Sequence, residues 1–403
     1  MTGSTVWITG YGAVTAAGPT SAYLADAIQL GRSSVRALPE FGGVHCAPID
    51  EVPNCRMGRR LDRSARLFVS AAEEAWGKAS LDDLPFEPER IAVFEGSSLG
   101  PLAASLRTHE ADLTSGRART SRALDILRLM PGAGGATFAQ AHGVRGPVLQ
   151  ITAGSVSAAC AIGEAYQRIA SGSVDVAVAG GSECPLEASI VSRFVASGLL
   201  SPAANGGSPC RPFDRTRQGT VLGEGAGALV LESEEHALRR GVGPCALLSG
   251  YGLASEAWSL IAPDPSGAGV LQATRQAIGN HGGEPGWIKA HGTGTRAGDS
   301  AEYFGLAAAF ERRLPTIPIT GLKPLIGHCL GASGAVEAVA AILAIGQGIV
   351  PATLGTTEVD PAFPLFSLAL ERRCCANRSA LLLAQSFGGR CSALLIRAPV
   401  GDS

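Results

Sequence analysis

The sequence predicts an α/β protein made of two duplicated halves, near residues 1–240 and 241–403. Three pairs of apolar runs ending in glycine support this prediction, and the runs occur in the same order in both halves. The pairs are Val6–Gly12 with Leu247–Gly252, Ile91–Gly96 with Trp287–Gly292, and Val174–Gly181 with Ala380–Gly389. An apolar run that stops at glycine is typical of a strand leaving a sheet, and ordered repetition indicates a duplicated unit.

Stretches of small residues between these runs predict helices. Ala158–Ser171 is rich in alanine and is followed by Gly172, and Ala332–Gly346 has a similar composition. Helices that alternate with short apolar strands predict mostly parallel sheets covered on both faces. The most apolar window, Gly334–Val350, contains Glu337 and is predicted to be a core helix rather than a membrane span.

Composition narrows the classes of function. The chain has 403 residues and a formal net charge of -2, so no basic excess indicates a nucleic-acid partner. The start, Met1–Gly10, lacks the pattern of a signal peptide. Ten cysteines are scattered without metal-binding spacing, so we expect reduced thiols, no metal site and a cytoplasmic protein that is not bound to a membrane.

Two histidines lie in loops of small residues. His291 belongs to Lys289–Glu302 and is expected at the exit of a strand, where small neighbours let a ligand approach. His328 belongs to Gly321–Glu337, on the loop leading into an apolar helix. Each histidine taken alone is more often structural, but the glycine context favours a site. Lysine occurs only three times in the chain, so Lys323 beside His328 is a further candidate.

A third candidate is Ser155 in the segment Gly146–Cys160. A β run breaks at Ala153–Ser155 and a helix of small residues follows, which resembles a nucleophile elbow at a helix N-terminus. The spacing is not Gly-x-Ser-x-Gly, and a simple helix cap is the alternative interpretation.

Several longer motifs together resemble the β-ketoacyl synthase family, in its single-function form that depends on acyl carrier protein. They are Arg211–Glu232, His291–Thr295, Gly327–His328 and Phe387–Gly389. The resemblance spans essentially the whole chain. It implies the thiolase-like fold, with five layers (αβαβα) made from two duplicated halves, and usually a homodimer.

The resemblance also implies roles for individual residues. The family's nucleophile is a cysteine, and alignment from both sides places Ser155 at that position, with Cys160 a packed thiol inside the helix. The family's two histidines match His291 and His328, and its lysine matches Lys323. Acyl loading on a serine is expected to be strongly impaired, because a hydroxyl is a much weaker acid than a thiol. Decarboxylation needs only donors to an enolate oxygen, which the histidines can supply.

Other positions match residues that surround the family's site. Thr293 and Thr295 match threonines that bind the phosphopantetheine arm. Phe387, followed by Gly388, matches a gating phenylalanine, and Glu337 matches a buried glutamate near the site. Two residues depart from the pattern beside that gate: Ser386 replaces a glycine and Cys391 replaces an asparagine. No cofactor of its own is implied, since the phosphopantetheine arm arrives on the carrier protein.

We therefore expect a decarboxylase that converts malonyl-acyl carrier protein to acetyl-acyl carrier protein, as in the β-branching cassettes of polyketide pathways. One alternative is a partner subunit resembling a chain-length factor, paired with an active ketosynthase as a heterodimer. The other is an acyltransferase that uses Ser155. The choice between malonyl and methylmalonyl, and between homodimer and heterodimer, stays open at this point.

Overall fold

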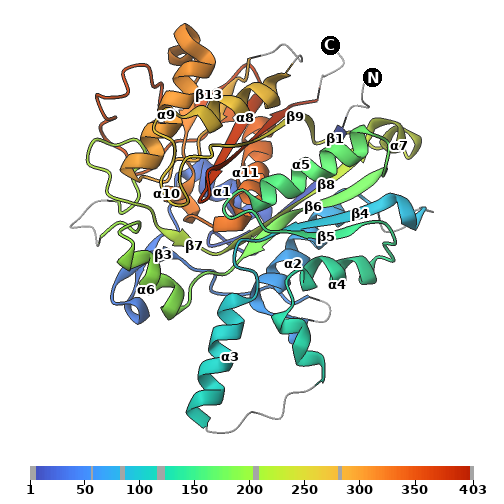
Figure 1. The fold of residues 1–403 in the computed structure, drawn as a ribbon. Coiled ribbons are helices and arrows are strands. Elements are labelled where there is room, and N and C mark those ends of the chain that lie inside the picture. The colour runs from blue at the N-terminus through green and yellow to red at the C-terminus, as the bar shows by residue number, and fades with distance from the viewer. Residues whose placement is uncertain are drawn as a thin grey trace.

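The protein is described here by a computed structural model that covers residues 6–55, 58–81, 87–115, 123–202, 208–279 and 284–399 (Figure 1). The first five residues of the start examined for a signal peptide lie outside these ranges.

The described residues of the first half form five strands of the main sheet and seven α-helices. Its strands are β1 (Val6–Thr15), β4 (Ile91–Gly96), β5 (Val148–Ile151), β6 (Val176–Glu183) and β8 (Gly225–Ser233). Its helices are α1 (Ser21–Leu30), α2 (Arg63–Lys78), α3 (Leu102–Ser115), α4 (Ala133–Ala141), α5 (Ser157–Ala170), α6 (Ala188–Ala196) and α7 (Glu234–Arg239). A small separate sheet consists of β2 (Arg36–Leu38), β3 (Val44–Ala47) and β7 (Leu222–Gly223). Short 3₁₀ turns are η1 (Pro39–Phe41), η2 (Gly58–Arg60), η3 (Pro88–Arg90) and η4 (Ala123–Leu129).

The second half has a matching set of elements. Its strands are β9 (Ala246–Ser255), β10 (Trp287–Lys289), β11 (Ile319–Thr320), β14 (Ser379–Ser386) and β15 (Arg390–Arg397). Its helices are α8 (Ala268–Ile278), α9 (Arg296–Phe310), α10 (Lys323–Ile326) and α11 (Ser333–Gln347), with 3₁₀ turns η6 (Glu311–Thr316) and η7 (Leu330–Ala332). The two-residue strands β12 (Ile349–Val350) and β13 (Arg373–Cys374) pair with each other.

The two halves repeat the same sheet topology. The strand order is β1-β8-β6-β4-β5 in the first half and β9-β15-β14-β10-β11 in the second. In each order the first two ladders are antiparallel and the last two are parallel. A short antiparallel ladder between β1 and β9 joins the two sheets at their edges. The three strand pairs that the sequence echoes identified occupy equivalent places, which confirms the predicted duplication.

The expectation of mostly parallel sheets was wrong, because both sheets are mixed. β8 lies antiparallel between β1 and β6, and β15 lies antiparallel between β9 and β14. A continuous apolar run is typical of parallel strands because helices cover both of their faces. Here the antiparallel strand β8 is buried along its whole length as well, so its composition carries no sign of its direction.

Helices and sheets stack in five layers. α5 and α11 lie between the two sheets, while α2 and α4 cover the outer face of the first sheet and α8 and α9 that of the second (Figure 1). Alternate residues of one strand face different layers: on β14, Leu382 packs with the central helices and Leu381 packs with the outer ones. Such strands need apolar residues on both faces, which explains why they read as unbroken apolar runs.

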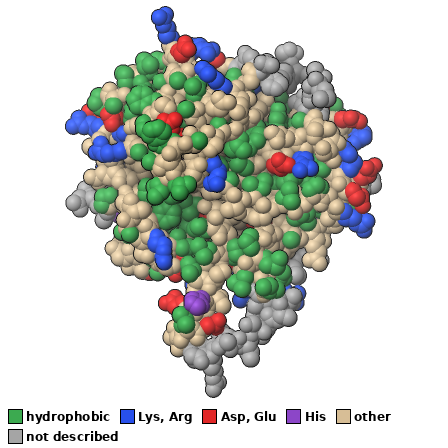
Figure 2. Space-filling model, viewed as in Figure 1, with side chains coloured by type: hydrophobic (Ala, Val, Ile, Leu, Met, Phe, Trp, Pro, Cys, Tyr) green, Lys and Arg blue, Asp and Glu red, His purple; other side chains and the backbone are tan. Residues whose placement is uncertain are grey.

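The predicted helices are confirmed to within two residues, as α5 and α11. The window Leu330–Gln347 is long and apolar enough to cross a membrane by composition, but 83% of it is buried inside the protein. It is therefore the core helix that the sequence predicted. On the face shown in Figure 2, basic and acidic side chains are interspersed over the described surface, which fits the net charge of -2.

Candidate active site

A pocket of about 480 Å³ lies where the two halves meet. Eight of the residues singled out from the sequence line it: Ser155, His291, Thr293, Thr295, His328, Ser386, Phe387 and Cys391. Lys323 and Glu337 are fully buried behind the histidines rather than on the pocket wall. Gly388 is the next residue after Phe387, and its N–H donates to the carbonyl of Leu260, so it anchors the loop instead of lining the pocket.

Ser155 lies on the turn between β5 and α5. Gly154 precedes it with a φ of 65°, a conformation that side chains rarely adopt, and this turns Ser155 toward the pocket. Its Oγ lies 3.2 Å from Nε2 of His328, and its backbone N–H donates to Oγ of Ser386 at 2.9 Å. Ser155 makes no side-chain cap on α5, so the simple capping alternative does not describe this residue.

The two histidines stand side by side. Their ring centroids are 5.2 Å apart and the rings are nearly perpendicular, at 83°. The carboxylate of Glu302 accepts the backbone N–H groups of His291 and Gly292, which fixes the loop after β10. Nδ1 of His328 is 3.0 Å from Oγ of Ser333, the first residue of α11. The start of α11 therefore holds one ring nitrogen of His328.

Both histidines are kept neutral. Burial, and then the charge of Lys323, hold the pKa of His291 and that of His328 well below the ordinary value of 6.5. A neutral imidazole offers one N–H donor and one acceptor nitrogen, so the function of each ring depends on which nitrogen carries the proton.

Lys323 decides that question for His291. Its ammonium donates to the carbonyl oxygen of His291 and to Oε1 of Glu337 at 3.0 Å, and it lies 3.3 Å from Nδ1 of His291. An ammonium can only donate, so Nδ1 of a neutral His291 is the acceptor and the proton is on Nε2. Because Lys323 occupies Nδ1, His291 presents an N–H donor at Nε2.

A second lysine completes the buried charge cluster. Lys289, the last residue of β10, donates to Oε2 of Glu337 and to the carbonyl oxygen of Leu383 at 2.6 Å. Glu337 on α11 therefore bridges two ammonium groups, and all three side chains are at most 3% exposed. Burial lowers the pKa of Lys289, and the charge of Glu337 opposes that shift. With both lysines protonated and Glu337 ionised, these three groups together carry a net positive charge behind His291.

The threonine loop is tied into α9. Oγ1 of Thr295 accepts the N–H of Gly298 and so caps the helix, and it lies 2.8 Å from Oγ1 of Thr293. Asp299 in the first turn accepts the N–H groups of Gly294 and Phe213. These contacts hold the loop rigid while both threonine side chains border the pocket.

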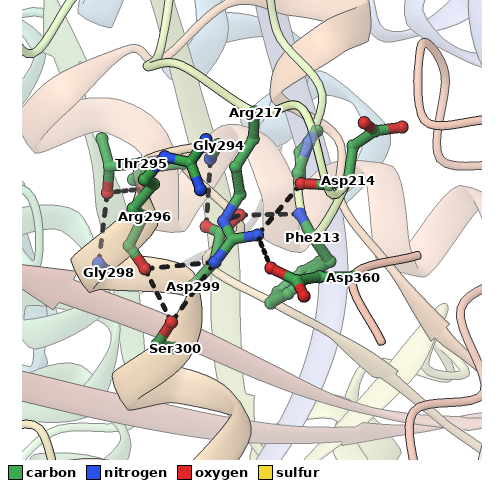
Figure 3. A network of polar contacts seen from close by, with 12 residues as sticks. Phe213, Asp214, Arg217, Gly294, Thr295, Arg296, Gly298, Asp299, Ser300 and Asp360 are labelled. Atoms are coloured by element: carbon green, nitrogen blue, oxygen red, sulfur yellow. Dashed lines mark hydrogen bonds and ion pairs between the residues drawn. The ribbon is translucent and has the colours of Figure 1, made fainter. Parts of the chain in front are cut away.

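Figure 3 shows the network that supports this loop from behind. The guanidinium of Arg217 pairs with Asp360 at 2.6 Å and lies 3.5 Å from Asp299. Arg217 also donates to the carbonyl oxygens of Asp214 and Arg296. The network explains the motif Arg211–Glu232 in part, because Arg217 joins the motif to the start of α9.

The mouth of the pocket is apolar and open. Phe387 is 48% exposed and Ile261, on the loop after β9, is 71% exposed, and both line the pocket. Ser386 has no φ in the left-handed region, so the serine at this position is not strained. The departure from glycine therefore acts through its side chain and not through its backbone.

Cys160, five residues after Ser155, is not part of the pocket wall. Cys160 is buried, and burial raises the pKa of its thiol. This agrees with its interpretation as a packed thiol. Within the described ranges, no group of three or more His, Cys, Asp or Glu side chains is arranged to hold a metal ion.

Sequence reasoning missed two residues of the site. Lys289 could have been found, because it is one of three lysines and lies two residues before His291. Glu302 gave no such signal, since its importance depends on backbone N–H groups that only the folded chain brings to it. Ser386 was identified as a departure from the family pattern, but its contact with the N–H of Ser155 was not predicted.

Known proteins are similar to this chain over most of its length. Residues 53–237 match the N-terminal domain of β-ketoacyl synthases and residues 245–357 match the C-terminal domain. The chain is 33% identical to nodulation protein E of Rhizobium sp. (strain N33), with 88% of this chain and 90% of that protein covered. It is 31% identical to the tetracenomycin polyketide synthase ketoacyl synthase alpha subunit of Streptomyces glaucescens, with 98% and 97% covered.

Solved structures are similar over nearly the whole chain. One is the AntDE:AntF complex, a type II PKS acyl-carrier protein with its ketosynthase bound to the hexaketide, with a TM-score of 0.91, 25% identity, and 98% and 100% of the two chains covered. Another is the ishigamide ketosynthase/chain length factor, with a TM-score of 0.89, 27% identity, and 99% and 100% covered. The duplicated five-layer architecture, the paired histidines in their two loops and these matches lead to one conclusion: this chain belongs to the β-ketoacyl synthase family and has its thiolase-like fold.

Proposed function

We propose that this chain decarboxylates malonyl-acyl carrier protein to acetyl-acyl carrier protein and does not condense acyl chains. The observation that carries the proposal is the pair of neutral histidines beside a hydroxyl at position 155. Ser155 stands where the family has its cysteine nucleophile, whereas His291, His328 and Lys323 match the family's other catalytic residues. The first half, residues 1–240, then carries Ser155, and the second half, residues 241–403, carries both histidines.

The reaction needs donors at one oxygen atom. The bond between the carboxylate carbon and the α-carbon of the malonyl group breaks, and carbon dioxide leaves. The electron pair becomes an enolate of the acetyl thioester, and a proton from solvent water added to the α-carbon completes the acetyl group. Nε2–H of His291 is set by Lys323 to donate to the enolate oxygen. His328 donates in the same way when the hydroxyl of Ser333 donates to its Nδ1.

The charge cluster favours the same chemistry. The two ammonium groups of Lys289 and Lys323 share the single carboxylate of Glu337 behind His291. Their net positive charge stabilises an anion in the pocket, because water does not fully screen the attraction there. Thr293 and Thr295 border the pocket and are proposed to bind the phosphopantetheine arm, with Phe387 as the gate and Gly388 anchoring its loop.

Acyl transfer by Ser155 is less well supported. His328 is the only imidazole within hydrogen-bond distance of Ser155 in the described chain, and its lowered pKa makes it a weak base. The second ring nitrogen of His328 contacts the hydroxyl of Ser333. A carboxylate at that place would stabilise the protonated ring, but a hydroxyl does so less well. A serine needs such a base before it can attack a thioester.

A partner subunit is the second candidate, and one observation favours it. The similar ishigamide structure is a complex of a ketosynthase with a chain length factor. Under this hypothesis the chain pairs with an active ketosynthase, whereas the proposed decarboxylase forms a homodimer. In both cases we propose acyl carrier protein as the partner and a cytoplasmic location, with no metal, no cofactor of the chain's own, and no nucleic acid or membrane bound.

Intact-mass analysis of the carrier protein tests the proposal. Malonyl-carrier protein and methylmalonyl-carrier protein are incubated separately with the purified chain alone. The expected result is loss of carbon dioxide from malonyl-carrier protein, slowed about 100- to 1,000-fold by His291→Ala and by His328→Ala. An unchanged malonyl mass with folded protein contradicts the proposal and supports the partner subunit. A stable acyl adduct on the chain that Ser155→Ala removes supports the acyltransferase.

A further inference from the structure

The backbone N–H of Ser155 is already bonded to a side chain from the other half of the molecule. It donates to Oγ of Ser386 at 2.9 Å, a contact between residues 231 positions apart. Ser386 is the last residue of β14, and its side chain borders the pocket together with Ser155. The hydroxyl fits closely against Gly154, since a Cβ at that glycine would lie 2.0 Å from Oγ of Ser386.

This N–H group has a defined use in acyl transfer. When a nucleophile at position 155 attacks a thioester, the carbonyl oxygen becomes an oxyanion and needs donors at about 2.7–3.1 Å. The N–H of the attacking residue is close to that oxygen, and the N-terminus of α5, which begins two residues later, favours negative charge there. In this chain, the N–H of Ser155 donates to the oxygen of Ser386 instead, at a distance within that range.

We propose that Ser386 is a specificity-determining residue that closes the oxyanion position at residue 155. The site is then unable to acylate residue 155 efficiently, whether that residue carries a hydroxyl or a thiol. The proposal concerns acylation alone, because Ser386 makes no hydrogen bond to His291 or His328 among the described residues. The inference shares with the proposed function only the placement of the nucleophile position at residue 155.

Two variants test the proposal with acetyl-S-N-acetylcysteamine as the acyl donor. In Ser155→Cys, the introduced sulfur attacks the thioester carbonyl and forms a new carbon–sulfur bond. The original carbon–sulfur bond then breaks, and N-acetylcysteamine leaves and takes up the proton lost by the attacking thiol. We expect Ser155→Cys/Ser386→Ala to be acylated about 100- to 1,000-fold faster than Ser155→Cys, the effect of one oxyanion donor.

Alkylation by iodoacetamide is the control reaction, since it forms a carbon–sulfur bond without any oxyanion. Its rate at residue 155 is expected to be equal in both variants, which also shows that the site is folded and accessible. Ser155→Cys/Ser392→Ala is the matched control variant: Ser392 is a buried hydroxyl on the adjacent strand, and its Oγ has no hydrogen-bond partner among the residues that the structure describes.

Equal acylation rates with and without Ser386→Ala overturn the proposal. So does an equal rise in alkylation and acylation, because Ser386 would then control access alone. Decarboxylation by the unaltered chain is measured in a separate assay. A failure of the proposed function would therefore leave the result for Ser386 standing, and the reverse also holds.

Discussion

Lys289 and Glu337 form an ion pair in the interior of the protein, directly behind the paired histidines. The ammonium of Lys289 donates to Oε2 of Glu337, and Lys323 donates to Oε1 of the same carboxylate. One carboxylate thus serves two lysines in a region where all three side chains are at most 3% exposed. The pair connects β10 to α11, and so ties the second sheet to the central helix layer.

Glu337→Gln is expected to destabilise the protein by about 3–5 kcal/mol, because it leaves two buried ammonium groups without a carboxylate. Lys289→Met is expected to cost less, since Lys323 still pairs with Glu337. The free energy of unfolding in urea measures both effects. Equal losses in the two variants would show that Glu337 does not bridge the lysines.

Lys289→Met is also expected to shift the pH dependence of decarboxylation. The charge of Lys289 contributes to the lowered pKa of His291 and of His328, after burial and Lys323. Removing it raises both histidine pKa values, so the rings become protonated at a higher pH as acid is added. The acid limb of kcat/KM therefore moves to higher pH. Lys78→Met, on the outer helix α2, is the matched control and should leave the limb where it is.

Ser155→Ala is expected to lower the rate of decarboxylation by no more than about tenfold, the effect of one ordinary hydrogen bond. The hydroxyl contacts His328, but the proposed reaction forms no bond to Ser155. His291→Ala, in contrast, removes a donor to the enolate and should cost about 100- to 1,000-fold in kcat. A loss on Ser155→Ala as large as that on His291→Ala would give the serine a direct part in the chemistry.

Glu95 on β4 is expected to make stability fall as pH rises. Burial raises the pKa of Glu95 to about 7, from an ordinary value of 4.5. The unfolded chain ionises at lower pH than the folded one, so the stabilisation is complete below about pH 4.5 and is lost as pH rises to about 7. The total change from this one group is about 3 kcal/mol.

Glu95→Gln removes one titration and should reduce the dependence of unfolding free energy on pH over that range, while Glu183 and Asp299, whose pKa values burial also raises to about 7, keep their share. The carbonyl oxygen of the glutamine can still accept the N–H of Gly135, which donates to Glu95 at 2.7 Å. Glu89→Gln, a surface carboxylate that is 64% exposed, is the control and should leave the slope unchanged. An unaltered slope in Glu95→Gln would show that another group carries the pH dependence.

The sequence predicted the architecture well because duplication leaves a local signal. Each strand echo, such as Ile91–Gly96 with Trp287–Gly292, reflects a run that must be apolar on both faces and must stop where the chain turns. Strand direction left no such signal: β8 and β15 are as apolar as their neighbours, so the mixed character of the sheets was missed.

The site was predicted in part, for a similar reason. His291, His328 and Ser155 lie in glycine-rich motifs, and the fold brings all three to one pocket. The bond between Ser155 and Ser386 joins two loops that are far apart in the chain, and its meaning depends on where a single N–H group points. Composition and spacing contain no information about that direction.

The duplicated topology allows the two partial reactions of a condensing enzyme to be separated by mutation. The groups proposed to handle the carbanion, namely His291, Lys323 and His328, all follow strands of the second sheet, whereas the position that would hold an acyl group precedes α5 in the first. A substitution on the loop before α5 therefore acts mainly on one partial reaction, since Lys323 and Ser333, which hold the histidine rings of the other, lie in the second half. In such a fold, mutations can abolish the acylation step while carbon–carbon bond cleavage is kept.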